Sequence, residues 1–227
     1  MEVSRRSLCS HPSYKFNRQS NMNLQIDQLI QHLDALPKQG RQLVAVVGAP
    51  GAGKSTLSEA VVEHLRQSGR KVQLVPMDGF HLDNGILNAR GLFARKGAPQ
   101  TFDAAGFLSL VQRLVKGEEV IAPTFDRMHD LSIAGAVEVP ADVELLVLEG
   151  NYLLLDQPIW RELKQYWDLS IYLDVPLDEL ERRLIQRWLD HGLDPEAAAA
   201  RARGNDLVNA QLVVEHSQPA DVTLQNY

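Results

Sequence analysis

One eight-residue stretch, Gly48-Ala49-Pro50-Gly51-Ala52-Gly53-Lys54-Ser55, carries the residue types that bind phosphate. Its spacing fits G-x-x-x-x-G-K-[ST], the loop whose backbone N–H groups surround the phosphates of a nucleotide. Glycines allow the backbone conformations that turn those N–H groups inward. Lys54 can reach the β- and γ-phosphates, and the Ser55 hydroxyl can bind Mg²⁺. Together with Thr56, which follows, the stretch is predicted to bind a nucleoside triphosphate.

Two carboxylates follow predicted buried strands. Asp78 comes shortly after the strand expected at 71–76, and Glu149 directly follows the apolar run 145–148. Because ligands of open α/β sheets bind beyond the carboxyl ends of the strands, both should share a crevice with Lys54. Glu149 could hold Mg²⁺, and Asp78 could accept the proton of an attacking hydroxyl group. The alternatives are an ordinary charge at a strand end and a plain Asp-Gly turn.

Three further candidates each have two explanations. His81 could hydrogen-bond a substrate, or it could be a structural or solvent-facing group. Arg183 and Arg187 are four residues apart on a predicted helix and could clamp a phosphoryl group. They could equally pair with Glu179 and Asp190 on a solvated helix face.

The elements that position these residues alternate along the chain. The valine-rich run 43–47 predicts a strand buried on both faces, and helical spacing from Leu57 to Leu65 predicts the helix after the loop, with His64 on its inner face. The segment 82–99 holds no period and is expected to be a long polar loop. Further helices are expected at 24–36, 103–115, 160–166, 176–188 and 195–215, and further strands at 119–123, 136–139, 169–173 and 220–224. This alternation predicts an α/β fold with a parallel sheet covered by helices on both faces.

Length and composition indicate one domain with a substantial core, since the chain has 227 residues and is 44% hydrophobic. A net charge of −6 argues against a general affinity for nucleic acid or anionic membranes and favours a small-molecule partner. Cys9 is the single cysteine, so no internal disulfide can form and a cytoplasmic location is the simplest expectation. Residues 1–21 are expected to form a disordered extension before a single domain at 22–227.

Four segments, in this order and spacing, resemble the phosphoribulokinase/uridine kinase family, which includes the bacterial pantothenate kinases. They are the phosphate loop, Asp78-Gly79-Phe80-His81, Phe125-Asp126-Arg127-Met128-His129-Asp130 and Glu149-Gly150-Asn151-Tyr152. The resemblance implies the three-layer fold of P-loop nucleoside triphosphate hydrolases with a helical lid around 183–205. It implies ATP and Mg²⁺ as cofactors, Asp78 as catalytic base and Glu149 as the acid near the metal.

Within the family, the segments look most like a bacterial subgroup labelled fructose-transport or nucleoside kinases. The acceptor implied is a small molecule with a hydroxyl group, either a fructose-like sugar or a uridine-like nucleoside, with pantothenate as an alternative. A regulatory ATP-binding protein or ATPase without an acceptor is the rival interpretation. The oligomeric state stays open, with a homodimer as one option. The residues expected to contact the acceptor are Asp78, Phe80, His81, Phe125, Asp126, Arg127, His129 and Tyr152.

One departure weakens a strict uridine kinase interpretation. Uridine kinases usually carry a tyrosine-aspartate pair followed four places later by a histidine. Here Phe125 lacks the tyrosine hydroxyl, and His129 comes three places after Asp126.

Overall fold

The computed structural model describes residues 12–37 and 40–226. Its centre is a five-stranded parallel sheet in the order β2-β5-β1-β6-β7. Every residue of β1 and β5 is buried, which explains why both strands are almost wholly apolar. The predicted parallel sheet is therefore confirmed. The strands span Gln42–Gly48 (β1), Val72–Pro76 (β2), Leu145–Gly150 (β5), Leu169–Asp174 (β6) and Val222–Gln225 (β7).

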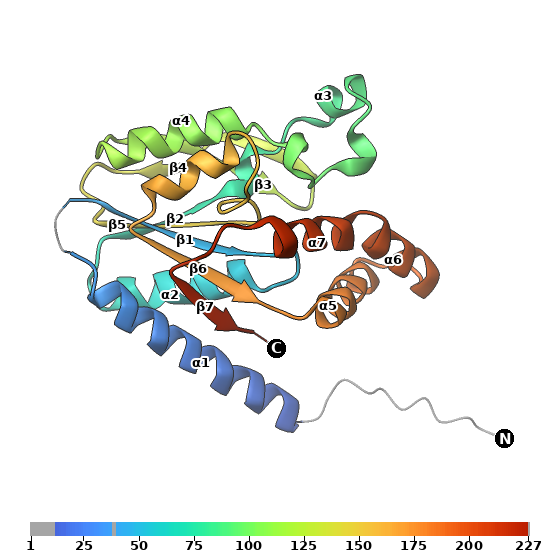
Figure 1. Ribbon diagram of the computed structural model, residues 1–227, viewed down its shortest axis with the longest axis horizontal. Coiled ribbons are helices and arrows are strands. Elements are labelled where there is room, and N and C mark those ends of the chain that lie inside the picture. The colour runs from blue at the N-terminus through green and yellow to red at the C-terminus, as the bar shows by residue number, and fades with distance from the viewer. Residues whose placement is uncertain (1–11, 38–39, 227) are drawn as a thin grey trace.

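Helices cover both faces of this sheet, as Figure 1 shows. On one face lies α2 (Lys54–Gln67), with α1 (Pro12–Asp34) packed outside it. On the other lie α4 (Ala104–Val115) and the 3₁₀ helix η4 (Trp160–Tyr166). The three-layer arrangement is thus as predicted. α1 also includes residues 12–21, which were expected to belong to the disordered extension, while residues 1–11 lie outside the described part.

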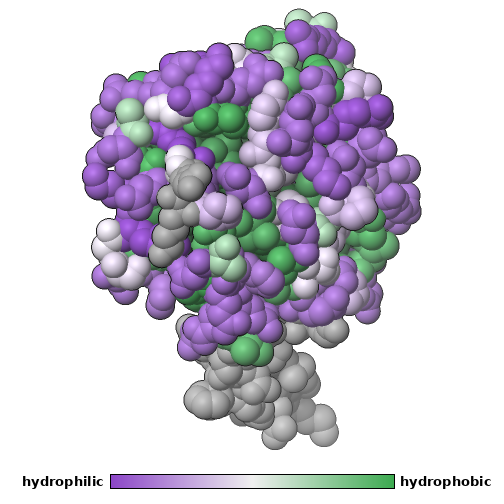
Figure 2. All heavy atoms as spheres, turned by 60° about the vertical axis from the view of Figure 1, so that its left-hand side comes forward, coloured by the Kyte–Doolittle hydropathy of each residue, from purple (hydrophilic) through white to green (hydrophobic). Residues whose placement is uncertain are grey.

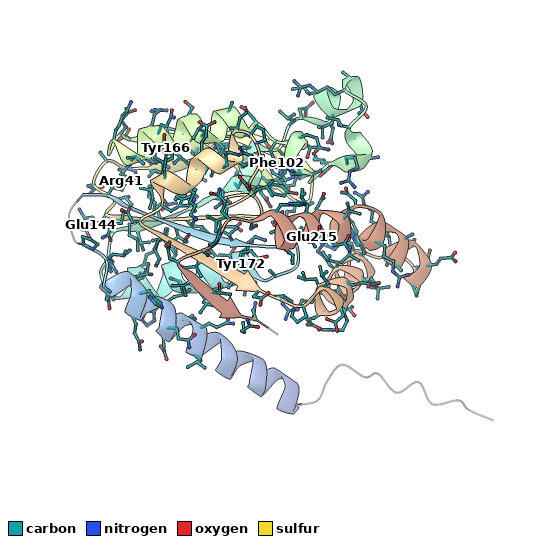
Figure 3. All side chains as sticks on the ribbon, viewed as in Figure 1. Arg41, Phe102, Glu144, Tyr166, Tyr172 and Glu215 are labelled. Atoms are coloured by element: carbon teal, nitrogen blue, oxygen red, sulfur yellow. The ribbon has the colours of Figure 1, made fainter. Side chains whose placement is uncertain are left out.

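A group of helices from the C-terminal part of the chain lies at the carboxyl ends of β1 and β6 (Figure 1). It consists of α5 (Leu177–Asp190), α6 (Pro195–Arg201), the π-helical turn η5 (Ala202–Asp206) and α7 (Leu207–His216). This group contains the predicted lid segment. Arg41 and Glu144, labelled in Figure 3, lie at the opposite, amino end of the sheet.

Two segments differ from the prediction. The segment 82–99, predicted to be a loop without regular structure, forms α3 (Asn84–Ala89) and the 3₁₀ turn η2 (Phe93–Arg95), with a further turn, η3 (Pro99–Thr101), at its end. The Asp83 carboxylate caps α3 by accepting the Gly85 N–H, and Leu87 is fully buried, so local capping and one apolar anchor suffice to order it. The strands β3 (Val120–Asp126) and β4 (Leu131–Val139) pair antiparallel with each other, as a ribbon separate from the parallel sheet.

Polar side chains dominate the molecular face in Figure 2, and the hydrophobic ones form separate small groups. Within the ranges 12–37 and 40–226, no helix combines the length and apolar character needed to cross a membrane. The apolar side chains instead gather around the sheet, where Phe102, Tyr152 and Trp160 form an aromatic layer with ring centroids 5.6–6.1 Å apart.

Candidate active site

The phosphate loop joins the buried strand β1 to α2 through two residues with left-handed backbone angles, Gly51 at φ +83° and Gly53 at φ +92°. At Gly53 a Cβ atom would also lie 2.8 Å from the side-chain nitrogen of Asn226, so another residue there would be strained and would displace the Asn226 amide. Among the described residues, no side chain caps the N-terminus of α2. Its first N–H groups therefore stay available for a phosphate, which the helix dipole also favours.

Lys54 is almost fully buried beneath this loop. Its ammonium donates to the backbone oxygen of Ala49 at 3.1 Å and to the side-chain oxygen of Asn151 at 2.6 Å. Burial lowers the pKa of Lys54, while the nearby Glu149 and Asp78 carboxylates act in the opposite direction. Since an ammonium has three N–H groups, one remains for a phosphate oxygen.

Glu149 and Ser55 lie together at the start of α2. The Ser55 hydroxyl donates to Glu149 Oε1 at 3.2 Å, and Glu149 is only 5% exposed. Burial, and secondly the Asp78 carboxylate, raise the pKa of Glu149. A hydroxyl beside a carboxylate supplies the oxygen ligands that Mg²⁺ prefers, so the pair fits the metal. In the described part of the chain, no cluster of three or more His, Cys, Asp or Glu could hold a metal unaided, so phosphate oxygens and waters would have to complete the shell.

Asp78 lies in the short 3₁₀ helix η1 (Met77–Phe80), directly after β2. Its Oδ2 accepts a hydrogen bond from Nη2 of Arg127, which comes from the turn between β3 and β4, at 2.7 Å. Asp78 and Arg127 border a cavity of about 600 Å³ together with Lys54, Ser55 and Glu149. Asp78, just after β2, and Glu149, near the end of β5, thus face one crevice with the phosphate loop.

Both candidate arginines of α5 also border this cavity, and both are held by acids. Arg183 pairs with Glu179 at 2.7 Å, as the alternative interpretation predicted. Hydrogen bonds from Arg182, and further those from Arg183, lower the pKa of Glu179 to about 2. Arg187 pairs at 3.1 Å with Asp206 of η5 and not with Asp190, the partner that the alternative interpretation offered. The Asp206 carboxylate also accepts a hydrogen bond from the indole N–H of Trp188. One acid of η5 therefore holds two neighbouring side chains of α5.

His81 lies between the rings of Phe102 and Phe125, at centroid distances of 4.0 and 4.5 Å. Its Nδ1 lies 2.8 Å from the Asp78 backbone oxygen, which can only accept, so Nδ1 carries the proton. Burial lowers the pKa of His81 and therefore favours the neutral ring. A neutral ring with a protonated Nδ1 leaves Nε2 able to accept a hydrogen bond.

Other predicted acceptor contacts have structural partners of their own. Phe80 packs edge-on against Phe107 of α4 at 5.1 Å. The Asp126 carboxylate accepts the backbone N–H groups of Met128 and His129 and bonds the His129 ring, which fixes the β3–β4 turn.

Tyr152 is fully buried, and its hydroxyl donates to the Gly97 backbone oxygen. Burial raises the pKa of this hydroxyl far above its usual value. Of the residues predicted to contact the acceptor, Asp78 and Arg127 line the cavity, whereas Phe80, His81, Phe125, Asp126, His129 and Tyr152 are not among its lining residues.

Two residues that sequence reasoning missed contact the phosphate loop. Asn151, the partner of Lys54, is part of the Glu149–Tyr152 motif, and its place after a buried strand could have revealed it. Asn226 donates to the Ala52 backbone oxygen at 2.6 Å, and its own backbone oxygen accepts from Arg183 at 2.7 Å. Gln25 of α1 donates to the backbone oxygen of Gln225 beside it. No sequence signal marks Asn226, because its role depends on how β7 lies next to the loop.

Comparison with known proteins places these features in one family. The family model "Phosphoribulokinase / Uridine kinase family" matches residues 43–226. A crystal structure of a "putative fructose transport system kinase" from Silicibacter sp. TM1040 is 52% identical with a TM-score of 0.82, covering 89% of this chain and 98% of that one. The Escherichia coli K12 protein YggC, which has no described activity in its name, is 32% identical over 99% of this chain and 94% of its own length. The Schizosaccharomyces pombe protein "Putative uridine kinase C227.14" is 34% identical over 85% of this chain and 86% of its own length.

Proposed function

This chain belongs to the phosphoribulokinase/uridine kinase family of P-loop kinases, and from that premise we propose that it transfers the γ-phosphoryl group of ATP to a hydroxyl group of a small molecule. One observation supports this most strongly: Lys54, Glu149 and Asp78 border the same cavity of about 600 Å³. That volume is within the range of small-molecule sites. A phosphate-binding group, a metal-binding acid and a base thus have access to one reacting centre.

Each residue has a separate task in this mechanism. The N–H groups at the start of α2 and the Lys54 ammonium bind and orient the phosphates. Ser55 and Glu149 would hold Mg²⁺, which would offset negative charge on the phosphates. Asp78 accepts the proton of the acceptor hydroxyl as its oxygen attacks the γ-phosphorus. Arg187, which keeps donors beyond its Asp206 contact, neutralises charge that develops on the transferred group.

The acceptor is proposed to be a sugar or a nucleoside. The Silicibacter relative is described by fructose transport and the Schizosaccharomyces relative by uridine, and a relative from Rhodococcus opacus is named pantothenate kinase. Pantothenate therefore stays as the second choice. The single cysteine, Cys9, remains the ground for proposing a cytoplasmic location.

The test is a panel of sugars, nucleosides and pantothenate incubated with ATP and Mg²⁺. ADP release and the phosphorylated product, the latter identified by mass spectrometry, are measured together. We expect at least one acceptor to accelerate ADP release and to appear as its phosphate ester. ADP release that no acceptor changes would instead favour a regulatory ATPase.

The Asp78→Asn variant tests the base assignment. We expect it to lose most phosphoryl transfer, by about 10²–10⁴-fold, while its ATP affinity stays near that of the wild type. Asp142→Asn is the matched control, because Asp142 also has a cationic partner at 2.7 Å, Lys71, but is exposed and is not among the cavity residues. Wild-type turnover in Asp78→Asn would remove Asp78 from the base role.

A further inference from the structure

We propose that Arg127 selects acceptors that carry a carboxylate or phosphate group in addition to the reacting hydroxyl, because such an anion draws Arg127 away from Asp78 and so frees the base. This inference rests on the proposed kinase function and narrows its substrate class. It gives Arg127 a role in choosing the acceptor, at the part of the cavity that Asp78 borders.

The first step is the position of Arg127. It lies in the turn between β3 and β4, its side chain is 63% exposed, and it borders the cavity. Its Nη2 donates to Asp78 Oδ2 at 2.7 Å. Within residues 12–37 and 40–226, Nε and Nη1 of Arg127 make no hydrogen bond, so the side chain can move by breaking one contact.

The second step is a conflict between this contact and the proposed mechanism. Asp78 must receive the proton of the acceptor hydroxyl, yet the Arg127 guanidinium already donates to one of its two oxygens. An acceptor hydroxyl has to compete with a charge-assisted hydrogen bond, which is about twice as strong as a neutral one. A neutral acceptor therefore meets a base that is partly occupied.

The third step is what can displace Arg127. A carboxylate or phosphate presents two oxygens that match the fork of a guanidinium, so it can bind in a bidentate manner. A neutral polyol offers hydroxyl groups only and competes poorly with the Asp78 carboxylate. An anionic acceptor thus gains a contact with Arg127 and at the same time uncovers Asp78 Oδ2.

Lys96, another cation close to the β3–β4 turn, is not available for this purpose. Its ammonium lies 5.1 Å from the centroid of the Phe125 ring and donates to Asn84 Oδ1 at 2.7 Å and to the Asp130 backbone oxygen at 2.6 Å. It also pairs with Asp130 Oδ2 at 2.9 Å, and its side chain is only 9% exposed. Its N–H groups are therefore committed to holding α3 against the β3–β4 turn.

The reaction itself then balances without a further reactant. The acceptor oxygen forms a bond to the γ-phosphorus as the bond from that phosphorus to the β–γ bridging oxygen breaks. ADP leaves with the electron pair of the broken bond. The hydroxyl proton passes to Asp78 Oδ2 and from there to water.

The test compares matched acceptors that differ in one anionic group. Fructose is paired with fructose 6-phosphate, and glycerol with D-glycerate, so that the two pairs separate phosphate from carboxylate recognition. The values of kcat and KM are measured for the wild type, Arg127→Gln and the control Arg161→Gln. Arg161 is a suitable control because it is a similarly exposed arginine, paired with Asp156 at 3.2 Å, that does not border the cavity.

We expect the charged member of at least one pair to exceed its neutral partner in kcat/KM by about tenfold to a hundredfold in the wild type, the size of one hydrogen bond to a charged group. Arg127→Gln should abolish most of this preference, while Arg161→Gln should retain it. Equal kcat/KM values for charged and neutral acceptors in the wild type, or an equal loss for both in Arg127→Gln, would overturn the proposal.

A binding measurement keeps this inference separate from the proposed function. The NMR signal of the Arg127 Nε–H group, assigned by its loss in Arg127→Gln, is followed while fructose 6-phosphate or D-glycerate is added. A saturable shift with either anion, absent with fructose and glycerol, supports anion recognition even if no acceptor is phosphorylated and the kinase proposal fails. The absence of any shift contradicts anion recognition whatever the activity.

Discussion

The Lys54 ammonium lies 2.6 Å from the side-chain oxygen of Asn151, so that the phosphate loop after β1 is joined to the end of β5. This contact holds a buried cation with a neutral partner. A neutral oxygen orients the ammonium without cancelling the charge that the phosphates need. In the proposed mechanism, the contact therefore serves nucleotide binding better than an ion pair would.

The Asn151→Asp variant tests this arrangement. An aspartate at this position would pair with Lys54 and would repel the phosphates, so we expect the KM for ATP to rise by about tenfold or more. Asn88→Asp is the control, because it adds the same charge on the exposed surface of α3. An unchanged KM in Asn151→Asp would show that Asn151 does not govern the Lys54 charge.

Glu149→Gln is expected to stabilise the ligand-free protein at neutral and alkaline pH. Burial raises the pKa of Glu149 in the folded state, so its favourable contribution is complete below its unfolded pKa near 4.5 and is lost as pH rises through the folded value. Above that point the protein must hold a buried carboxylate, and the amide removes this cost. Thermal unfolding at pH 8 should give a higher Tm for the variant, by about 2–4 °C for each kcal/mol.

The same variant should lose the additional stabilisation that Mg²⁺ with a non-hydrolysable ATP analogue gives the wild type. A lower Tm for ligand-free Glu149→Gln, or a full response to Mg²⁺, would contradict the assigned role. The comparison is made at fixed ligand concentration, because binding shifts Tm by mass action.

His81 is expected to be neutral at pH 7, with the proton on Nδ1. Burial lowers the pKa of His81 in the folded protein. Between pH 6.5 and that lower pKa, His81 is therefore protonated in the unfolded chain but neutral in the folded protein. The associated stability is complete above pH 6.5 and falls as pH decreases through that window. The measurements are ¹⁵N NMR of the imidazole and urea unfolding between pH 5.5 and 7.5.

His81→Phe should unfold with a weaker pH dependence than the wild type over this window. His64→Phe, the same replacement on the exposed side of α2, should keep the wild-type dependence. A proton on Nε2 at pH 7 in the NMR spectrum would show that this nitrogen cannot accept a hydrogen bond from a ligand.

Tyr152→Phe should lower the free energy of unfolding by about 1–3 kcal/mol. The change removes the hydroxyl that donates to the Gly97 backbone oxygen and keeps the ring in its aromatic layer with Phe102 and Trp160. Urea unfolding at pH 7 measures the difference. A loss of more than about 3 kcal/mol would mean that the ring packing also changes, and no loss would mean that water satisfies Gly97 equally well.

The sequence predicted the sheet and the residues that its strand ends carry. Buried strands are apolar on both faces, and the phosphate loop fixes the point where β1 ends, so the amino-acid pattern alone sufficed to place Asp78 and Glu149 at the same edge. On α2 the helical period placed His64 inside, whereas Val62 is buried instead and His64 is exposed. A small rotation of α2 about its own axis is enough to bury Val62 in place of His64.

Contacts between distant segments could not be predicted in the same way. Arg127 and Asp78 are 49 residues apart, and their pairing depends on how the β3–β4 ribbon lies over η1. Arg187 had an acid at a helical spacing, Asp190, but the π-helical turn η5 brings Asp206 nearer. Tyr152 and Phe80 carried the right residue types for ligand contact, and burial gives them other partners.

The side chain of Asn226, which bonds Ala52 while its backbone oxygen holds Arg183, matters for anyone who engineers this molecule. A purification tag, a reporter fusion or a protease cut at that position would disturb a residue that contacts both the phosphate loop and Arg183 of the proposed nucleotide site. Gln25 of α1 donates to the backbone oxygen of Gln225, the neighbour of Asn226. A shortened version of the protein would therefore have to keep both Gln25 and Asn226.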